Sequence, residues 1–208
     1  MSAQGRPRRR SIVLVRHGES DLNAAGRFVG RSDPPLNARG ERQARDLAAS
    51  VARFAPEVVV ASSLRRAHQT AELAAATCRP TGGVQVDERL REVDFGAWEG
   101  LTFDEVRERD PAGSAAFESG KIDGFPGGES VHDVAGRMLP AVTGREAGRA
   151  LFVSHATVVR VTVAALLGLD LPAYRQALVR PAPCSWTQLE KTPAGWRLVA
   201  YNAEVVRE

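Results

Sequence analysis

The residues with the clearest chemical potential are two histidines that each follow a short apolar run. His17 comes directly after the run 12–15 and one arginine, and His155 comes after the run 150–153 and one serine. An imidazole with one unprotonated ring nitrogen is a nucleophile that works near neutral pH. If the two runs are neighbouring parallel strands, their carboxyl ends bring both imidazoles to the same edge of the sheet.

Arginines and a carboxylate add the other groups that phosphoryl transfer needs. Arg16 precedes His17, the pair Arg65 and Arg66 follows a third apolar run, and Glu92 lies in a connection farther along the chain. A guanidinium is planar, permanently charged and able to bind two phosphoryl oxygens at once. A carboxyl group can protonate the leaving oxygen. Each residue alone is weak evidence, but together they indicate phosphoryl chemistry.

The elements that must position these residues follow from the apolar patterns. Continuous runs predict buried strands over 12–15, 57–61 and 150–153. Apolar residues at helical spacing predict helices over 38–54, 65–77 and 158–167, with Asn37 as an N-cap. This alternation predicts an α/β fold, a three-layer αβα sandwich around a mainly parallel central sheet in a single domain.

Two further segments have a weaker or different pattern. The glycine- and proline-rich stretch 95–128 predicts an insertion with one or two short helices lying across the site. The segments 184–190 and 196–201 predict a hairpin around 192–195.

Composition restricts the class of partner. The net charge is +3, and because residues 1–10 carry four arginines, the remainder is not basic. We therefore expect a basic flexible tail over 1–10, a domain over 11–208 and no nucleic-acid partner. No apolar run approaches membrane-spanning length, so no membrane partner is expected. Cys78 and Cys184 are isolated, which favours reduced thiols and a cytoplasmic location.

Several motifs resemble those of one family, the histidine phosphatase or phosphoglycerate-mutase-like superfamily. Residues 16–20 read Arg-His-Gly-Glu-Ser, which is similar to its Arg-His-Gly-Glu/Thr-Ser/Thr signature. The stretch 62–71 resembles its Ser-Pro-Leu-x-Arg-Ala-x-Gln-Thr-Ala block, and the stretch 90–100 resembles the motif that bears the acid. Further blocks match at 30–44, 126–130 and 153–155, so the resemblance spans about residues 11 to 202 in consistent order.

The resemblance implies a role for each matched residue. His17 would attack phosphorus and become phosphohistidine, while Arg16, Arg66 and His155 would hold the phosphoryl oxygens. Glu92 would protonate the leaving alcohol and then activate water. The expected catalytic residues are thus His17, Glu92, His155, Arg16 and Arg66, and the expected substrate-binding residues are Arg16, Gly18, Asn23, Arg66, His155 and Ala156. The family requires no metal or cofactor, and the resemblance is compatible with a homodimer.

The chain departs from the family pattern at a few positions. Val29 stands where mutases of the family carry threonine and many of its phosphatases carry glutamine, and Ala156 stands where glycine is common. Other polar residues have a simpler interpretation: His68 and His132 are expected at the surface or in structural roles, and Glu19 is expected to make structural hydrogen bonds.

Three functions remain open at this stage. The first is a metal-independent phosphatase for monoesters of small metabolites, of the sugar-phosphate or phosphoglycerate type, similar to the broad-specificity and glucosyl-3-phosphoglycerate phosphatases. The second is a 2,3-bisphosphoglycerate-dependent phosphoglycerate mutase, and the third is a non-catalytic binding module on the same fold. Mutases of the family carry a longer segment between the acid and the second histidine than the segment from Glu92 to His155, which favours the phosphatase.

Overall fold

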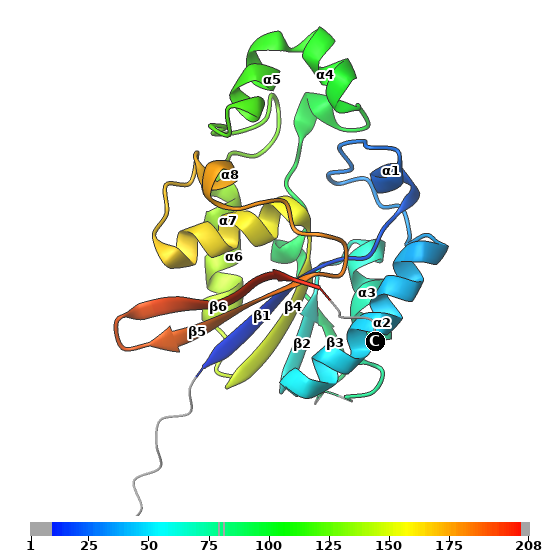
Figure 1. Cartoon of the computed structure of the whole chain (residues 1–208), viewed down its shortest axis with the longest axis vertical. Coiled ribbons are helices and arrows are strands. Elements are labelled where there is room, and N and C mark those ends of the chain that lie inside the picture. Colours follow the sequence, from blue (N-terminus) through cyan, green and yellow to red (C-terminus); the bar gives the residue numbers. More distant parts are fainter. Residues whose placement is uncertain (1–9, 79, 81, 205–208) are drawn as a thin grey trace, which may run out of the picture.

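A computed structural model describes residues 10–78, 80 and 82–204, which form an α/β fold around one six-stranded sheet (Figure 1). The strand order is β3-β2-β4-β1-β5-β6. The strands are β1 (Ser11–Arg16), β2 (Val58–Ala61), β3 (Val84–Val86), β4 (Arg149–Ser154), β5 (Trp186–Thr192) and β6 (Gly195–Ala203). The first four are parallel, and β5 is antiparallel to both β1 and β6. The predicted three-layer sandwich with a mainly parallel sheet is confirmed.

Helices cover both faces of the sheet. On one face lie α2 (Ala38–Phe54) and α3 (Arg65–Ala75), and on the other lie α6 (Val131–Thr143) and α7 (Ala156–Leu167). Successive side chains of a strand point to opposite faces, so β1 contributes to two cores. Ile12 and Leu14 pack in the core beneath α6 and α7, whereas Val13 and Val15 pack in the core beneath α2 and α3. This is why the run 12–15 is apolar throughout.

The remaining helices lie beyond the carboxyl ends of the parallel strands. They are α1 (Asp21–Ala24), α4 (Phe103–Arg109), α5 (Pro111–Glu118) and α8 (Tyr174–Ala177), with single 3-10 turns at Glu88–Leu90 and Gly96–Trp98. Helices α4 and α5 form a cap at the top of Figure 1, which matches the two short helices expected in the insertion. Asp110 fixes the α4–α5 corner, because its carboxylate accepts hydrogen bonds from the Gly113 amide and the Trp98 indole.

Helix boundaries follow from local capping. The side chain of Asn37 accepts a hydrogen bond from the Gly40 amide, so the predicted N-cap of α2 is confirmed. Helix α7 begins at Ala156, two residues earlier than expected, because the backbone of His155 already serves as its N-cap. Strand β3 has three residues, none of them fully buried, and is too short to produce a sequence pattern.

The expected tail lies almost entirely outside the described residues. Only Arg10 of that segment is described, and its guanidinium donates hydrogen bonds to the carbonyls of Val142 and Thr143. Arg10 is thus in contact with the end of α6. Within residues 10–78, 80 and 82–204, every helix is too short or too polar to cross a bilayer.

Candidate active site

The sheet topology brings the chemically important strand ends together. Strands β2, β4 and β1 are neighbours, and Arg66, His155 and His17 follow their carboxyl ends. The His17 amide donates to the Ser154 carbonyl at 2.9 Å, which continues the pairing of β1 with β4. As a result the imidazoles of His17 and His155 lie edge to face with their centroids 4.9 Å apart.

His17 is held in the state that a nucleophile requires. Its Nδ1 lies 2.6 Å from the Gly18 carbonyl, and because a carbonyl can only accept, Nδ1 carries the proton. Burial, with the nearby charges of Arg66 and Arg16, lowers the pKa of His17 well below its usual range. The ring is therefore neutral, and its Nε2 keeps a lone pair, toward which Arg66 Nε donates at 3.2 Å.

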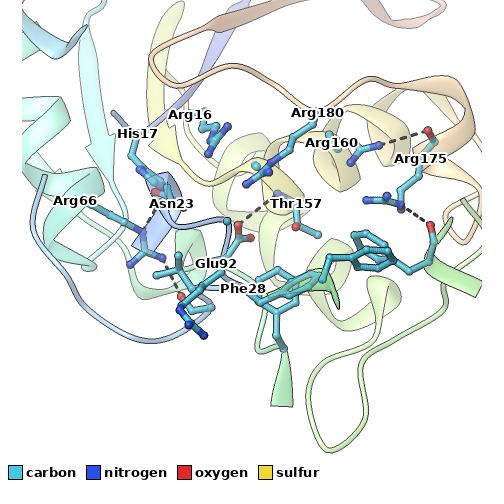
Figure 2. A pocket seen from close by; sticks show the side chains of 18 of the residues that line it. Arg16, His17, Asn23, Phe28, Arg66, Glu92, Thr157, Arg160, Arg175 and Arg180 are labelled. Atoms are coloured by element: carbon cyan, nitrogen blue, oxygen red, sulfur yellow. Dashed lines mark hydrogen bonds between the residues drawn. The ribbon is translucent and has the colours of Figure 1, made fainter. Parts of the chain in front are cut away.

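Arg66 is the second residue of the pair at the start of α3, and only 1% of it is exposed. Its two terminal nitrogens donate to the carbonyls of Gly30 and Ser32 at 2.8 and 2.7 Å. These contacts fix the guanidinium beside His17 (Figure 2). Arg65 is exposed and faces away, so the structure places Arg66 and not Arg65 at the site, as the motif alignment implied.

Arg16 approaches the site from the end of β1. Its Nη1 donates to the Pro181 carbonyl at 2.7 Å, whereas its buried Nε has no hydrogen-bond partner among the described residues. Burial and the charge of Arg180 lower the pKa of Arg16 to about 9, so it remains cationic at neutral pH. A buried donor without a partner is costly, and an anion in the cavity would relieve that cost.

The ring of His155 packs against that of His17, and the residue is fully buried. Its Nε2 is 2.9 Å from the Ser62 hydroxyl, and its Nδ1 has no partner within the described part of the chain. Burial and the charge of Arg66 lower the pKa of His155 well below its usual value. A neutral His155 can still donate one hydrogen bond, from Nδ1 when the Ser62 hydroxyl donates to Nε2.

Glu92 is the carboxylate of the site, and only 7% of the residue is exposed. Its side chain accepts from the amide of Val93 at 2.9 Å and is 3.5 Å from the amide of Thr157, at the start of α7. The side chain lines the same cavity as His17, Arg16 and Arg66. A carboxyl group and an imidazole thus face the same cavity.

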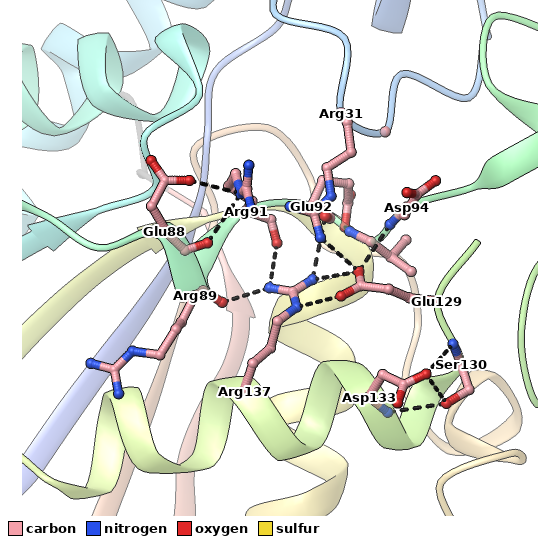
Figure 3. A network of polar contacts seen from close by, with 12 residues as sticks. Arg31, Glu88, Arg89, Arg91, Glu92, Asp94, Glu129, Ser130, Asp133 and Arg137 are labelled. Atoms are coloured by element: carbon pink, nitrogen blue, oxygen red, sulfur yellow. Dashed lines mark hydrogen bonds and ion pairs between the residues drawn. The ribbon is translucent and has the colours of Figure 1, made fainter.

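A partly buried ion pair holds the backbone that carries Glu92 (Figure 3). Arg137 on α6 donates to the carbonyls of Arg89, Arg91 and Glu92 and forms a two-point contact with the carboxylate of Glu129. Burial raises the pKa of Glu129, but the hydrogen bonds from Arg137 and from the Asp94 amide outweigh it, so the pKa is lowered. We call these two residues, Arg137 and Glu129, the clamp.

The cavity has a volume of about 460 Å³, far more than a phosphoryl group fills. Besides the expected Arg16, His17, Asn23, Arg66, Glu92 and Ala156, it is lined by residues that no motif indicated, chiefly Phe28, Thr157, Arg160, Arg175 and Arg180. Arg175 lies in the four-residue helix α8 and Arg180 in the irregular segment after it, and both segments are too short to give a sequence pattern. Arg160 could have been noticed in the sequence, because it is the one charged residue of helix α7.

Two expected substrate-binding residues, Gly18 and His155, are not among the residues that line the cavity. His155 instead contacts the ring of His17. The Gly18 amide donates to the Thr70 hydroxyl at 3.0 Å and so is not available to a phosphoryl oxygen. A Cβ at this position would lie 2.5 Å from the Gly40 carbonyl. The requirement for glycine is therefore the close approach of this loop to the start of α2, which corrects the expectation of substrate binding.

The residues set aside as structural behave as expected. Glu19 accepts hydrogen bonds from the side chains of Asn37 and Arg39, and His132 is exposed. His68 is partly exposed on α3, near Glu72 one turn away. Across the described residues, no group of three or more His, Cys, Asp or Glu side chains is arranged to hold a metal ion.

Comparison with known proteins agrees with this geometry. A sequence model of the histidine phosphatase superfamily (branch 1) matches residues 12–204. Two similar proteins are each called "Probable phosphoglycerate mutase GpmB". The protein from Enterobacter sp. (strain 638) is 34% identical over 93% of this chain and 91% of its own length, and that from Proteus mirabilis (strain HI4320) is 36% identical over 89% and 86%.

Solved structures of phosphatases share the fold. A mycobacterial glucosyl-3-phosphoglycerate phosphatase in complex with VO3 superposes with a TM-score of 0.85 at 34% identity, covering 94% of this chain and all of that one. The alpha-ribazole phosphatase from Shigella flexneri has a TM-score of 0.79 at 24% identity, covering 95% and 99%, and so supports the fold alone. The match of the family model over nearly the whole domain, together with these relatives, shows that the chain is an enzyme of the histidine phosphatase superfamily.

Proposed function

We propose that this enzyme hydrolyses phosphate monoesters of small metabolites through a phosphohistidine formed on His17. The observation that carries the proposal is the neutral His17, whose unprotonated Nε2 lies against Arg66 in a cavity that also contains Glu92. Phosphoryl transfer depends mainly on positioning and on charge around the phosphoryl oxygens. In this proposal the site supplies a nucleophile, permanent cations and a proton donor around one cavity.

In the first step, Nε2 of His17 attacks phosphorus, a nitrogen–phosphorus bond forms and the ester P–O bond breaks. Glu92, which must be protonated for this step, gives its proton to the leaving alkoxide. Arg16 and Arg66 donate to the phosphoryl oxygens, as does His155 through Nδ1. The unpartnered Arg16 Nε and His155 Nδ1 support this assignment, because each is a buried polar atom that a phosphoryl oxygen would satisfy.

In the second step, water attacks the phosphohistidine. Glu92, now ionised, takes a proton from that water while the nitrogen–phosphorus bond breaks and inorganic phosphate leaves. The site returns to its starting protonation state. A structure of the mycobacterial relative with inorganic phosphate bound, at 32% identity, is consistent with a phosphate-releasing reaction. Asn23 and Ala156 complete the wall around the substrate.

The proposal includes the physiological setting. The arginines supply the charge that other phosphatases obtain from metal ions, so the reaction needs no metal or cofactor. The partner is the small phosphate ester itself, and neither nucleic acid nor a membrane is involved. Cys78 and Cys184 are both free thiols, which supports a reducing, cytoplasmic location.

A phosphoglycerate mutase is the second candidate, and the observation that favours it is the name of the relatives from Enterobacter and Proteus. A mutase returns the phosphoryl group from histidine to a second hydroxyl, so it must keep water away from the phosphoenzyme. The short segment between Glu92 and His155 is the sequence feature against it. The two candidates share the first step and differ in what accepts the phosphoryl group.

The test separates the roles of His17 and Glu92. In the His17→Ala variant, turnover should fall to background, because the group that forms the covalent bond is gone. Glu92→Gln keeps shape but loses the proton, so its rate should fall about 10²–10⁴-fold on alkyl phosphates and less on p-nitrophenyl phosphate, whose leaving group hardly needs protonation. With the aryl ester, acid-labile phosphohistidine should accumulate on Glu92→Gln.

Alkaline rapid quench and intact-mass measurement detect that intermediate. The matched control is His68→Ala, a histidine outside the cavity, which should keep wild-type turnover. Covalent phosphate persisting on the His17→Ala protein would remove His17 as the nucleophile. A Glu92→Gln variant equally impaired on alkyl and aryl esters would assign the acid to another residue.

A further inference from the structure

The end of the cavity opposite His17 is rich in arginine (Figure 2). Arg160 comes from α7, and Arg175 and Arg180 come from α8 and the segment that follows it. Figure 2 shows His17 and Arg66 at one end and Arg160 and Arg175 at the other, with Glu92 and Thr157 between them. Arg180 lies between the two ends, near Arg16, whose pKa its charge lowers. The two arginines at the far end, 160 and 175, are called the distal arginines below.

The charges that line the cavity do not balance. Six arginines line it, and Glu92 is the one carboxylate among the described lining residues. Arg27 pairs with Glu105 at 3.1 Å, but the other five form no ion pair within the described part of the chain. A phosphoryl dianion offsets two of those five charges, and Glu92 offsets a third only when it is ionised. The cavity therefore retains a cationic excess that a single phosphate ester does not neutralise.

Arg160 is built into the wall rather than left on the surface. It is 5% exposed, its guanidinium lies over the Tyr174 ring at 4.8 Å, and its Nη2 donates to the Leu178 carbonyl. Its Nε is buried without a partner among the described residues. Keeping a cation buried in this way costs free energy, and burial lowers its pKa. A bound anion is the group that would repay this cost.

Arg175 extends the positive end, and Arg180 adds charge between that end and His17. The guanidinium of Arg175 stacks on the Phe117 ring of the cap, 3.4 Å from its centroid, and its Nε donates to the Phe117 carbonyl. This hydrogen bond uses only Nε, and the Tyr174 side chain is a further hydrogen-bond partner of the guanidinium. Arg180 is exposed at the cavity wall, and no hydrogen bond or ion pair engages its side chain in the described structure.

Helix α7 sets the distance between the two ends of the cavity. His155 is the N-cap of this helix, and Arg160 lies five residues farther on, which is about 7.5 Å along the axis. Ala156 and Arg160 are four residues apart and so share the face that lines the cavity. A ligand can therefore run along α7 from the nucleophile to the distal arginines, past the ring of Phe28.

We propose that the distal arginines form a second anion subsite, so that the preferred substrates are phosphate monoesters carrying another anionic group, a phosphate or a carboxylate, at the far end of a short backbone. This inference rests on the proposed phosphatase function and narrows its substrate class. The reacting phosphoryl group occupies the His17 end. The second anion remains attached to the product and is not transferred.

The test compares α,ω-alkanediol bisphosphates and ω-carboxyalkyl phosphates with ω-hydroxyalkyl phosphates of the same length. A hydrogen bond to a charged group is stronger than one to a neutral group, and the difference raises affinity by about tenfold or more. At the best length, kcat/KM for one of the two doubly anionic series should exceed that of the hydroxyalkyl ester by about tenfold, after correction for the two equivalent ends of a bisphosphate. The series that gains more identifies the second anion as phosphate or carboxylate.

Variants assign the effect to these residues. Arg175→Gln removes one charge from a half-buried side chain on α8 and should reduce the preference for the doubly anionic ester severalfold. Arg160→Lys keeps the charge but loses the fork geometry and should also reduce it. Arg45→Gln, an exposed arginine on α2 far from the cavity, is the matched control and should keep the wild-type preference.

The outcomes separate this inference from the proposed function. If all esters are hydrolysed with equal kcat/KM, the subsite is refuted and the phosphatase stands. A preference that survives in both Arg175→Gln and Arg160→Lys would also refute the assignment. If no ester is hydrolysed, the proposed function fails, and calorimetry with non-hydrolysable alkane bisphosphonates and monophosphonates decides the subsite. Equal affinity for the two phosphonates would overturn it, and tighter binding of the bisphosphonate would support it.

Discussion

At the scale of single residues, the two imidazoles of the site are neutral for a shared reason. His17 and His155 are buried next to Arg66, and both burial and the neighbouring cation disfavour a second proton on either ring. A neutral His17 has the lone pair that attack on phosphorus requires. The same arrangement makes the folded state sensitive to acid.

The first prediction follows from that neutrality. Below about pH 6.5 the unfolded chain binds a proton at each of these histidines and the folded chain does not, so the free energy of unfolding should fall as the pH falls. Each histidine contributes up to about 1.4 kcal/mol per pH unit below its usual pKa. Urea unfolding at about pH 7 and about pH 5 measures this loss.

A variant tests whether the loss of stability at low pH comes from these two histidines. His155→Gln removes one of the two groups, so its stability should depend less steeply on pH than that of the wild type. His68→Gln, on the partly exposed side of α3, should keep the wild-type pH dependence. Equal slopes in His155→Gln and the wild type would contradict the neutral, buried state of His155.

At the scale of elements, the segment that carries Glu92 has little regular structure of its own. It runs from one 3-10 turn to the next, and Arg137 on α6 holds three of its carbonyls. Glu129 orients Arg137 and also accepts from the Asp94 amide at 3.0 Å. The clamp therefore couples the position of the acid to the packing of α6.

The second prediction concerns this clamp. Glu129→Gln removes the charge that holds Arg137, so it should cost about 1–3 kcal/mol of stability and allow Glu92 to shift. Because Glu92 is the proposed acid, kcat should fall more for alkyl phosphates than for p-nitrophenyl phosphate. Urea unfolding and kinetics with the two esters measure the two effects.

Asp133→Asn is the matched control for that experiment. Asp133 lies on the same helix and caps its start through Ser130, but it does not contact the segment of Glu92. It should lower stability without changing the ratio of alkyl to aryl rates. A Glu129→Gln protein with an unchanged ratio would show that the clamp is structural only.

The elements and the site differ in how far the sequence predicts them. Buried strands such as 12–15 and helix 38–54 have long, clear patterns, and the motifs mark His17, Arg66, Glu92 and His155 by residue type and spacing. The clamp and the distal arginines were not predicted, because their contacts join segments far apart in the chain. Gly18 was assigned to substrate because sequence does not reveal that the Thr70 hydroxyl already accepts from its amide.

At the scale of the whole molecule, the fold separates a rigid base from a smaller cap. The parallel strands and their helices position His17, Arg66 and His155, while the cap supplies Phe117 and rests on an edge-to-face aromatic cluster. That cluster comprises Phe28, Phe95, Trp98, Phe117 and Phe125. The proposed chemistry takes place at the base, and the cap and α8 provide the distal end that would distinguish substrates.

The third prediction addresses the source of positive charge. The proposed mechanism assigns charge stabilisation to the guanidinium groups of Arg16 and Arg66, so incubation with EDTA should leave kcat/KM unchanged. Added Mg²⁺ or Zn²⁺ should not increase it. The measurement is phosphate release before and after chelation, on enzyme freed of metal by dialysis. Loss of activity that metal restores would contradict this mechanism.

The last prediction separates hydrolysis from mutase activity, which is a property of the whole cap and base. The cap helices α4 and α5 have only seven and eight residues, and a short segment of chain joins them to Glu92. A small cover should leave the phosphohistidine open to water, so water should compete with a second hydroxyl for the phosphoryl group.

With 3-phosphoglycerate as test substrate, release of inorganic phosphate should exceed formation of 2-phosphoglycerate, and 2,3-bisphosphoglycerate should not be required. Phosphate assay and NMR of the two phosphoglycerates measure both routes in one sample. Rapid interconversion with negligible phosphate release would instead assign the enzyme to the mutases, whose name its relatives from Enterobacter and Proteus carry.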